Sequence, residues 1–399
     1  MLRGSERGMA LPASPIRKLS SLAEETKKRG IHVYHLNIGQ PDLPTPEEGI
    51  AAMHNLSRKV LEYSPSQGLE SLRKRMTEYY REFGISLQPQ NIIITCGGSE
   101  ALLLSFFSCL DAGDEIIIPE PAYANYKTYA LMAGVHVKPL VSKIETGFAL
   151  PPISEFEKMI TPRTKAILIC NPNNPTGYTY SKEELLQIRD LVQKYHLYLF
   201  ADEVYREFCY TKEPHFSAMN LTGIDEQVIL IDSFSKRYSE CGTRVGAIVS
   251  RNEDVLAWVL KFAQARLSPP LLGQLVAEAS MSTPKSYLEK TYTEYISRRN
   301  LLIEGLNKID GVYSPLPQGA FYTTARLPID DCDKFCAWML SDFSYNGQTV
   351  MMAPASGFYS NPEHGKQEVR IAYVLEKEEL QKALVALEKG LQAYPGRLI

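Results

Sequence analysis

The 399-residue sequence predicts an α/β fold, in which a large domain holds a mostly parallel sheet of seven strands between helices and a smaller domain is α+β. Two observations predict this class. Short apolar runs alternate with helical patterns between residues 91 and 250, as is typical of strands buried on both faces of a parallel sheet. After residue 285 the alternation gives way to long helices mixed with short strands.

This change of pattern divides the chain into three expected segments. Residues 1–45 are expected to form an N-terminal arm and part of the smaller domain, residues 46–285 the large domain, and residues 286–399 the C-terminal smaller domain. A chain of this length can bury a large apolar core, so no disulfide or structural metal is required.

The first ninety residues predict helices separated by an extended, proline-rich path. The helices are expected at residues 16–28, 47–59 and 69–83, with an extended segment at 33–39 and a polar loop at 63–68. Pro41, Pro44 and Pro46 keep the chain extended before the second helix, because proline fixes its own φ and cannot donate a backbone hydrogen bond.

The strands of the predicted sheet follow at regular intervals. They are expected at residues 91–95, 115–118, 135–140, 165–170, 198–201, 228–232 and 245–250, with helices at 101–110 and 182–195. Later elements are expected at 286–307 (helix), 332–343 (helix), 369–373 (strand) and from 376 onward (helix). Because parallel sheets bind ligands beyond the carboxyl ends of their strands, polar residues directly after these runs are the candidate site residues.

Composition and charge argue against several classes of partner. The formal net charge is −3 with no basic block, which argues against nucleic acid and against an anionic membrane. No apolar run approaches the ~18 residues of a membrane span, and the N-terminus has no apolar signal core. Seven scattered cysteines favour reduced thiols in a cytoplasmic protein. Cys332 and Cys336 would share a helix face, but no histidine lies near them in sequence, so no metal site is predicted.

Residues 229–246 hold the most reactive combination of side chains. An apolar strand leads to Ser233, Ser235 and Lys236, and Arg244 follows eight residues after the lysine. A lysine after a strand is usually a solvated surface charge, but hydroxyls and an arginine beside it are groups that hold a phosphate. A buried lysine loses its charge more easily and can then form a Schiff base with a carbonyl compound.

Two further strands end in turns whose residues suit ligand binding. Gly98, Ser99 and Glu100 open a helix, where small residues and free N–H groups suit an anion, although an ordinary turn has the same composition. Residues 171–177, Asn-Pro-Asn-Asn-Pro-Thr-Gly, form a turn in which prolines would hold asparagine side chains rigidly. No glycine-rich dinucleotide motif or P-loop is present.

Four more side chains are candidates whose ordinary interpretations stay open. Asp202 follows an apolar strand and, if buried, needs a cationic partner such as a protonated pyridine nitrogen, although it could be a helix cap. Tyr205 could be an amphipathic aromatic, and Tyr123 could stack on a flat ring or pack in the core. Arg370 could clamp a carboxylate or form a surface ion pair.

In order and spacing, these residues resemble the pyridoxal-phosphate-dependent aminotransferases of fold type I, aspartate aminotransferase-like branch, over nearly the whole chain. The resemblance rests on Gly39-Gln40-Pro41-Asp42, Tyr63 before Gly68, Gly98-Ser99-Glu100, Pro121-Ala122-Tyr123, residues 171–177, Asp202-Glu203-Val204-Tyr205, Ser233-Phe234-Ser235-Lys236, Arg244 and Arg370. It implies that the cofactor is pyridoxal 5'-phosphate and that the large domain binds it.

The resemblance also implies roles for the residues around the cofactor ring. Lys236 would carry the cofactor as an internal aldimine and then move the proton between substrate and cofactor. Asp202 would keep the pyridine nitrogen protonated, so that the ring acts as an electron sink. Tyr205 and Asn174 would hydrogen-bond the ring oxygen, and Tyr123 would stack on the ring.

For the phosphate and the substrate, the resemblance implies a second set. The phosphate would be held by Gly98, Ser99, Glu100, Ser233, Ser235 and Arg244, and by Tyr63 of a neighbouring subunit, which implies a homodimer with shared sites. Arg370 would bind the substrate α-carboxylate, assisted by Gly39 and Asn174. The expected reaction is ping-pong transfer of an amino group from an L-amino acid to a 2-oxo acid, with 2-oxoglutarate as the expected acceptor, and domain closure would exclude water.

The amino donor is less defined than the reaction. Some aspartate-specific relatives have a lysine at the position of Ser99, and here Arg17 or Arg266 could read the distal carboxylate instead, although either could be a surface charge. Aspartate is the leading donor, and Tyr34, Tyr322 and Tyr359 would also permit an aromatic amino acid aminotransferase. A carbon–sulfur lyase of the same fold is the alternative reaction. A non-catalytic regulator of this fold would need an attached DNA-binding segment, and the sequence shows none.

Overall fold

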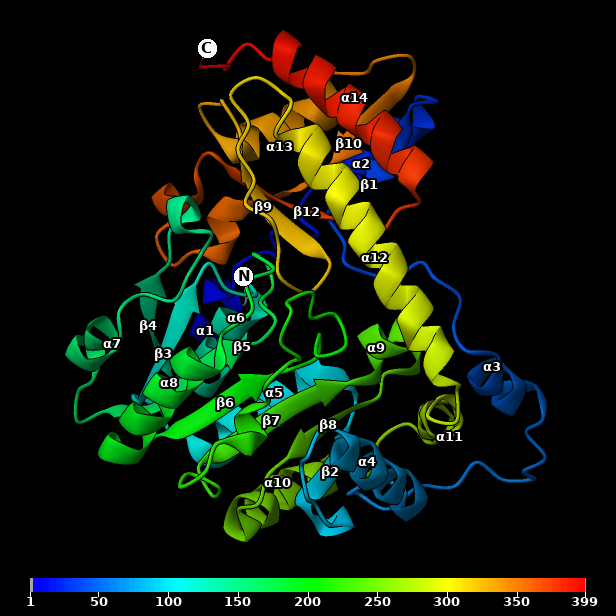
Figure 1. The fold of residues 1–399 in the computed structure, drawn as a ribbon, viewed down its shortest axis with the longest axis vertical. Coiled ribbons are helices and arrows are strands. Elements are labelled where there is room, and N and C mark those ends of the chain that lie inside the picture. The colour runs from blue at the N-terminus through cyan, green and yellow to red at the C-terminus, as the bar shows by residue number, and fades with distance from the viewer. Residues whose placement is uncertain (1–2, 399) are drawn as a thin grey trace.

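A seven-stranded sheet lies at the centre of the computed structural model, which describes residues 3–398 (Figure 1). Its strands are β2 (Ile92–Thr95), β3 (Glu115–Glu120), β4 (His136–Val141), β5 (Thr164–Cys170), β6 (Tyr198–Asp202), β7 (Val228–Ser233) and β8 (Gly246–Val249). The spatial order is β2-β8-β7-β6-β5-β3-β4, and only β8 runs antiparallel to its neighbours. Six strands therefore end at one edge of the sheet, and the predicted fold class is confirmed.

Helices cover both faces of this sheet, because its central strands are apolar on both sides. One face packs against α5 (Gly97–Cys109), α6 (Asn125–Ala133) and α10 (Glu253–Ala265). The opposite face packs against α4 (Glu70–Glu82), α7 (Ile153–Met159), α8 (Lys182–Tyr195) and α11 (Leu271–Ser280).

The chain after residue 285 builds a second region that shares one core with the first sheet face. Its antiparallel sheet has the order β11-β12-β9, formed by β9 (Tyr322–Arg326), β11 (Ala353–Pro354) and β12 (Glu368–Ala372). The helices are α12 (Lys285–Leu306), α13 (Cys332–Ser341) and α14 (Lys377–Ala393). Helix α12 runs from the large sheet to this region (Figure 1). The domain boundaries proposed from sequence remain a prediction.

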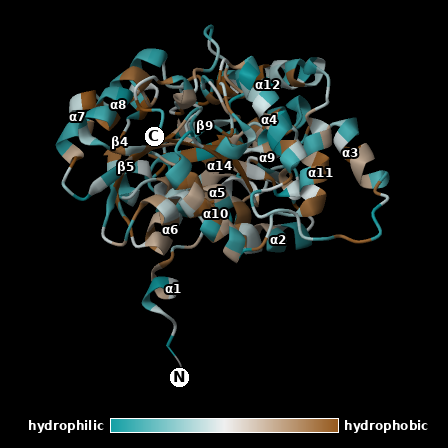
Figure 2. Ribbon diagram, turned by 90° about the horizontal axis from the view of Figure 1, so that it is seen from below, coloured by the Kyte–Doolittle hydropathy of each residue, from teal (hydrophilic) through white to brown (hydrophobic). Residues whose placement is uncertain are grey.

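The N-terminal residues contribute to the second region as well. Strand β1 (His32–His35) pairs in parallel with β10 (Gln348–Met351), and α2 (Ser20–Lys28) packs on α13. Helix α1 (Glu6–Ala10) buries no residue and projects from the body of the molecule (Figure 2), while α3 (Glu47–His54) packs on α11.

Several predicted boundaries were wrong, and one correction matters for the site. The helix expected at 101–110 begins at Gly97, so the glycine turn is itself the first helical turn. The helix expected at 47–59 ends at His54, and the one expected from residue 16 begins at Ser20. The extended segment at 33–39 contains a strand only as far as His35. Helices α6, α7, α10 and α11 were not predicted.

Two searches of the described residues bear on membranes and metals. None of the helices within residues 3–398 combines the length and the apolar character needed to span a bilayer. In the same residues, no group of three or more histidine, cysteine and acidic side chains is arranged to hold a metal ion.

Candidate active site

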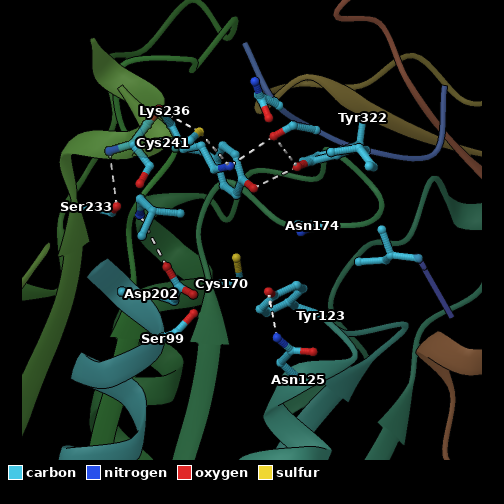
Figure 3. A pocket seen from close by; sticks show the side chains of 18 of the residues that line it. Ser99, Tyr123, Asn125, Cys170, Asn174, Asp202, Ser233, Lys236, Cys241 and Tyr322 are labelled. Carbon is cyan, nitrogen blue, oxygen red and sulfur yellow. Dashed lines mark hydrogen bonds between the residues drawn. The ribbon is translucent and has the colours of Figure 1, made fainter. Parts of the chain in front are cut away.

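A cavity of about 720 Å³ lies where the carboxyl ends of β5, β6 and β7 meet the second region (Figure 3). Its lining includes thirteen of the residues singled out in the sequence: Arg17, Gly39, Gly98, Ser99, Tyr123, Asn174, Asp202, Tyr205, Ser233, Ser235, Lys236, Arg244 and Arg370. Tyr63, Glu100 and Arg266 do not line it. The fold thus brings together side chains that lie more than 300 residues apart in sequence.

Lys236 sits on α9 (Phe234–Arg237), a four-residue helix that begins directly after β7. The hydroxyl of Ser233 accepts a hydrogen bond from the backbone N–H of Ser235 at 3.2 Å and so caps this helix. The Lys236 Nζ atom donates to the carbonyl of Gly39 at 2.9 Å and lies 3.8 Å from the Cys241 Sγ atom. No carboxylate of residues 3–398 forms an ion pair with this amine, so it is free to react.

Asp202 is the last residue of β6 and is 5% exposed. One carboxylate oxygen accepts from the Tyr126 hydroxyl at 2.6 Å and the other from the Val204 backbone N–H at 3.3 Å. Burial raises the pKa of this carboxyl to about 6, partly offset by the Tyr126 and Val204 hydrogen bonds. Within the described chain Asp202 has no cationic partner, which a buried carboxylate requires.

The position of two tyrosine hydroxyls beside the cavity requires a glycine at residue 39. Hydroxyls of Tyr205 and Tyr322 share a hydrogen bond of 2.9 Å, and the Tyr322 hydroxyl also donates to the Gly39 carbonyl at 3.4 Å. A Cβ atom on Gly39 would lie 1.7 Å from the Tyr322 hydroxyl oxygen, so only glycine permits this approach. The three residues join the N-terminal segment to β9 and to the turn after β6.

The first turn of α5 faces a set of anion-binding groups. Gly97 has a φ of +76°, and a Cβ atom there would lie 2.5 Å from an Nη atom of Arg244. The Arg244 guanidinium donates only to the backbone carbonyls of Cys241 at 3.0 Å and Cys96 at 3.4 Å. Among residues 3–398 it has no acidic partner, and the hydroxyls of Ser99, Ser233 and Ser235 line the same cavity. Such a cradle fits a phosphate.

Arg370 lies on β12 and is 1% exposed. Its guanidinium donates to the side-chain oxygen of Asn174 at 3.0 Å and to the carbonyl of Asn37, whereas its Nε–H has no partner in the described chain. Burial lowers its pKa, because no carboxylate compensates the loss of water. The rings of Tyr322 and Phe358 lie 4.5 and 5.1 Å from the guanidinium carbon. The site therefore holds a buried cation that needs an anion.

Tyr123 lines the cavity on the side of α6. Its hydroxyl accepts from the Asn125 side-chain amide at 2.9 Å, and its ring meets the Tyr126 ring edge-on at a centroid distance of 5.4 Å. Burial raises the pKa of the Tyr123 phenol, which keeps it neutral. In Figure 3 its ring borders the same space as Asn174 and Asp202.

Two predicted side chains point elsewhere. The Glu100 carboxylate accepts from the Cys96 backbone N–H at 2.7 Å and from Arg266 Nε at 3.1 Å, so it caps α5 rather than facing the cavity. This follows from the helix starting at Gly97, which puts Glu100 in the first turn, from where its side chain reaches back past the N-terminus. Arg266 is held by Glu100 and by the Ile94 carbonyl at 2.8 Å.

Tyr63 lies outside the cavity of its own chain and is 76% exposed. Of the aromatic residues considered for an aromatic substrate, only Tyr322 lines the cavity. The hydroxyl of Tyr34 donates to the Gln348 side chain at 3.0 Å, and that of Tyr359 donates to Glu368 at 2.7 Å. Both are structural residues of the second region.

Sequence reasoning missed Tyr126, Asn37 and Cys241 as site residues. A signal existed for Tyr126, which lies only three residues after Tyr123 and whose ring meets that of Tyr123 in the structure. No comparable signal existed for Asn37, which contributes a backbone carbonyl, or for Cys241, which begins a short 3-10 helix at residues 241–243.

The chain is similar in sequence and in structure to known aminotransferases. The profile of aminotransferase class I and II matches residues 31–387. Aspartate aminotransferase of Pyrococcus horikoshii is 31% identical over 394 residues, 97% of each chain. Aromatic-amino-acid aminotransferase 2 of Thermococcus litoralis is 31% identical over 395 residues, 97% of this chain and 98% of that one. The structure of Thermus thermophilus aspartate aminotransferase with maleate superposes with a TM-score of 0.89 at 29% identity, covering 98% of this chain and 100% of that one.

Proposed function

Because this chain belongs to the class I and II aminotransferases and is a pyridoxal-phosphate-dependent transaminase, we propose that Lys236, Asp202 and Arg370 are its principal catalytic and binding residues. We further propose that L-aspartate is the amino donor and 2-oxoglutarate the acceptor. The relatives described above include enzymes named for aspartate and for aromatic amino acids, so family membership alone leaves the donor open.

One observation carries the assignment of these residues. The cavity contains a buried carboxylate at Asp202 and a buried guanidinium at Arg370, and neither has a counter-ion within residues 3–398. Leaving a buried charge unpaired costs several kcal/mol in general (about 3–5 kcal/mol when one partner of a buried pair is removed). A protonated pyridine nitrogen would complement Asp202, and an α-carboxylate would complement Arg370.

The remaining lining fits pyridoxal 5'-phosphate. Gly98, Ser99, Ser233, Ser235 and Arg244 would hold the phosphate at the first turn of α5. Tyr123 would lie against the ring, while Tyr205 and Asn174 would donate to its oxygen. When bound, the cofactor supplies the electron sink for breaking the bond between the substrate Cα atom and its hydrogen.

Lys236 has the position required of a proton carrier. Its amine projects from a capped helical turn into the cavity, and of residues 3–398 only the Gly39 carbonyl and the Cys241 thiol lie within hydrogen-bonding reach. Held there, the amine can accept a proton at one atom of the substrate and deliver it at another, as a general acid–base catalyst must. Asn37 and Asn174 meanwhile fix the Arg370 fork that orients the substrate carboxylate.

Replacing Arg370 with glutamine should weaken every amino donor alike. The change removes two charge-assisted hydrogen bonds to the α-carboxylate, so kcat/KM should fall on the order of 10²- to 10³-fold, mostly through KM. Absorbance of the lysine-bound cofactor should stay at the wild-type level, because Arg370 does not face the phosphate cradle. Steady-state kinetics with several donors checks this, and an unchanged KM for all of them would remove Arg370 from the substrate site.

Arg17 is our candidate for reading the distal carboxylate of aspartate. It lines the cavity and is exposed, and no carboxylate within the described residues pairs with it. Arg266, the other candidate, is paired with Glu100 outside the cavity. The Thermus relative was solved with maleate, a dicarboxylate, which supports an acidic substrate.

Arg17→Gln should therefore lower kcat/KM for aspartate by about fivefold, as expected for an exposed ion pair, and change that for alanine by about twofold at most. Arg266→Gln is the matched control and should leave the ratio of the two donors unchanged. Equal losses for aspartate and alanine in Arg17→Gln would rule out this role, and a selective loss in Arg266→Gln would transfer it to that residue.

We also propose a homodimer in the cytoplasm. Large apolar side chains are exposed on α3, on the segment that follows it, in the turn before α11 and in the first turn of α11: Met53, Val60, Leu61, Tyr63, Leu267 and Leu272. A second copy covering this surface would bury it and could bring Tyr63 to the partner's phosphate cradle.

An aromatic amino acid is the second candidate for the amino donor, supported by the Thermococcus relative and by Tyr322 in the cavity. The lyase reaction has no such support.

A further inference from the structure

Four site residues have chain neighbours that lie together on the other face of the large sheet. Glu203 follows Asp202, Arg206 follows Tyr205, Asp232 precedes Ser233, and Arg237 follows Lys236. Along β6 and β7 this is the alternation of a strand, since Phe200 and Ile231 pack in one core cluster and Leu199 and Leu230 in the other. With Glu207, these neighbours form what we call the buried ionic network: Glu203, Arg206, Glu207, Asp232 and Arg237.

Arg237 is the centre of this network and is 1% exposed. Its Nε atom donates to the Glu207 carboxylate at 2.6 Å, and one Nη atom donates to both oxygens of Asp232 at 2.9 and 3.1 Å. Its guanidinium carbon lies 4.0 Å from the centre of the Tyr79 ring. Arg237 thus joins α9 to the end of β7, to the turn after β6 and to α4.

The other members extend the network under the cavity floor. Asp232 also accepts from the Tyr80 hydroxyl at 2.6 Å, and its pKa is about 2 because Arg237 and Arg206 outweigh the effect of burial. Glu203 accepts from Arg206 at 3.1 Å and from the Ala218 backbone N–H at 2.7 Å. Hydrogen bonds between carboxylates and guanidiniums are strong and directional, and they hold the members of the network in fixed positions.

A four-residue helix cannot hold its own orientation. One helical turn is unstable in isolation, because nucleation fixes many dihedrals for few hydrogen bonds. Helix α9 is capped at its start by Ser233, and its last residue is Arg237. The side chains of Lys236 and Arg237 leave this turn in different directions, one into the cavity and the other into the network. The contacts that fix Arg237 therefore also fix the backbone position from which the Lys236 side chain extends.

We propose that Arg237 is a positioning residue for Lys236, and that its bridge between Asp232 and Glu207 aims the Lys236 amine at the cofactor carbonyl. This rests on the proposed role of Lys236. An alternative is that the network only stabilises the fold. The two alternatives predict different results for a control variant that loses the same stability through a mutation outside the network. If Arg237 positions Lys236, only the network variants lose lysine reactivity. If the network only stabilises the fold, the network variants and the control behave alike.

The test measures how fast the cofactor-free protein captures pyridoxal 5'-phosphate through Lys236, followed by absorbance in a stopped-flow instrument. Arg237→Gln should slow capture by on the order of 10-fold or more, since small misplacements of a reacting group have effects of this size. Arg237→Lys keeps the positive charge but loses the forked guanidinium, so its rate of capture should lie between those of the wild type and Arg237→Gln. In the reconstituted enzyme kcat should fall while the donor KM stays near wild type, because Arg370 is untouched.

Leu199→Ala is the matched control. Leu199 is fully buried on the network side of β6, at the far end of the strand from Asp202, so its truncation lowers Tm without touching the network. Capture by this control should proceed at the wild-type rate. If Arg237→Gln does not fold, two other variants decide the question. One is Arg237→Lys, and the other is Glu207→Gln, which leaves the ion pair between Arg237 and Asp232 in place.

The proposal is overturned if the folded variants of Arg237 and Glu207 lose stability but capture the cofactor as fast as Leu199→Ala. A wild-type protein that does not bind the cofactor through Lys236 would instead refute the proposed function, and the two failures are thereby distinguished.

Discussion

Lys236→Ala is expected to abolish transamination, lowering kcat on the order of 10⁴-fold or more, the combined effect of losing covalent attachment and the proton carrier. The structure gives the reason in two contacts. The amine reaches the cavity from a capped turn, and its hydrogen-bond partners in the described part of the chain are the Gly39 carbonyl and the Cys241 thiol. Neither neighbour can replace a primary amine as attachment point and as base at neutral pH.

The measurement combines turnover with the absorbance of the bound cofactor. Lys236→Ala should lose the absorbance of the lysine-bound form, and its melting temperature should stay near that of the cofactor-free wild type. Lys138→Ala, which changes a half-buried lysine on the edge strand β4, is the control and should keep both colour and activity. An active but colourless Lys236→Ala would defeat the assignment.

Asp202→Asn is expected to have the second largest effect, lowering kcat on the order of 10³-fold while the fold stays intact. In an amide of the same shape the oxygen can accept from the Val204 N–H and the NH2 group can donate to the Tyr126 hydroxyl oxygen, but the amide cannot hold a proton on the pyridine nitrogen. Proton abstraction from the substrate should slow most, which a deuterium isotope effect at the substrate Cα would report. Near-normal kinetics would remove Asp202 from this role.

The same substitution should stabilise the cofactor-free protein. Burial raises the pKa of Asp202 from 3.8 to about 6, so ionising it costs the folded state up to about 3 kcal/mol. The sign follows from the raised pKa: the wild type is unpenalised below pH ~4 and loses stability, relative to Asp202→Asn, as the pH rises through ~6. Urea unfolding of both cofactor-free proteins checks this.

At pH 7.5 the free energy of unfolding of Asp202→Asn should therefore exceed that of the wild type, and the difference should vanish near pH 4. A wild type that is the more stable of the two at pH 7.5 without cofactor would mean that Asp202 already has a cationic partner. With cofactor bound the order should reverse, because the pyridinium then pairs with the carboxylate.

The strands and the candidate residues at their ends were accessible from sequence for a physical reason. Buried parallel strands must be continuously apolar, so the polar residue that follows each run stands out, as Asp202 and Ser233 do. A sheet with six strands in one direction then brings those ends to one edge. Helix 182–195 was predicted to the residue, and in the structure Ser181 and Glu184 form a capping box at its start.

What sequence could not supply is the direction of long side chains. Glu100 looked like a phosphate ligand, but one additional helical turn at Gly97 turned its carboxylate toward Arg266. The partnership of Asn37 with Arg370 spans 333 residues and uses a backbone carbonyl, which leaves no mark in the sequence. The buried ionic network was equally invisible, since Arg237 beside Lys236 could as well have been a surface cation.

We propose that Lys236, at the carboxyl edge of the sheet, is the residue that binds the cofactor and carries the reaction. Borohydride reduction of the holoenzyme, followed by digestion and mass spectrometry, tests it most directly. We predict one modified peptide per chain, with the phosphopyridoxyl mass on Lys236. A label on any other lysine, or a cofactor that washes out unattached after reduction, would show that Lys236 does not carry the cofactor.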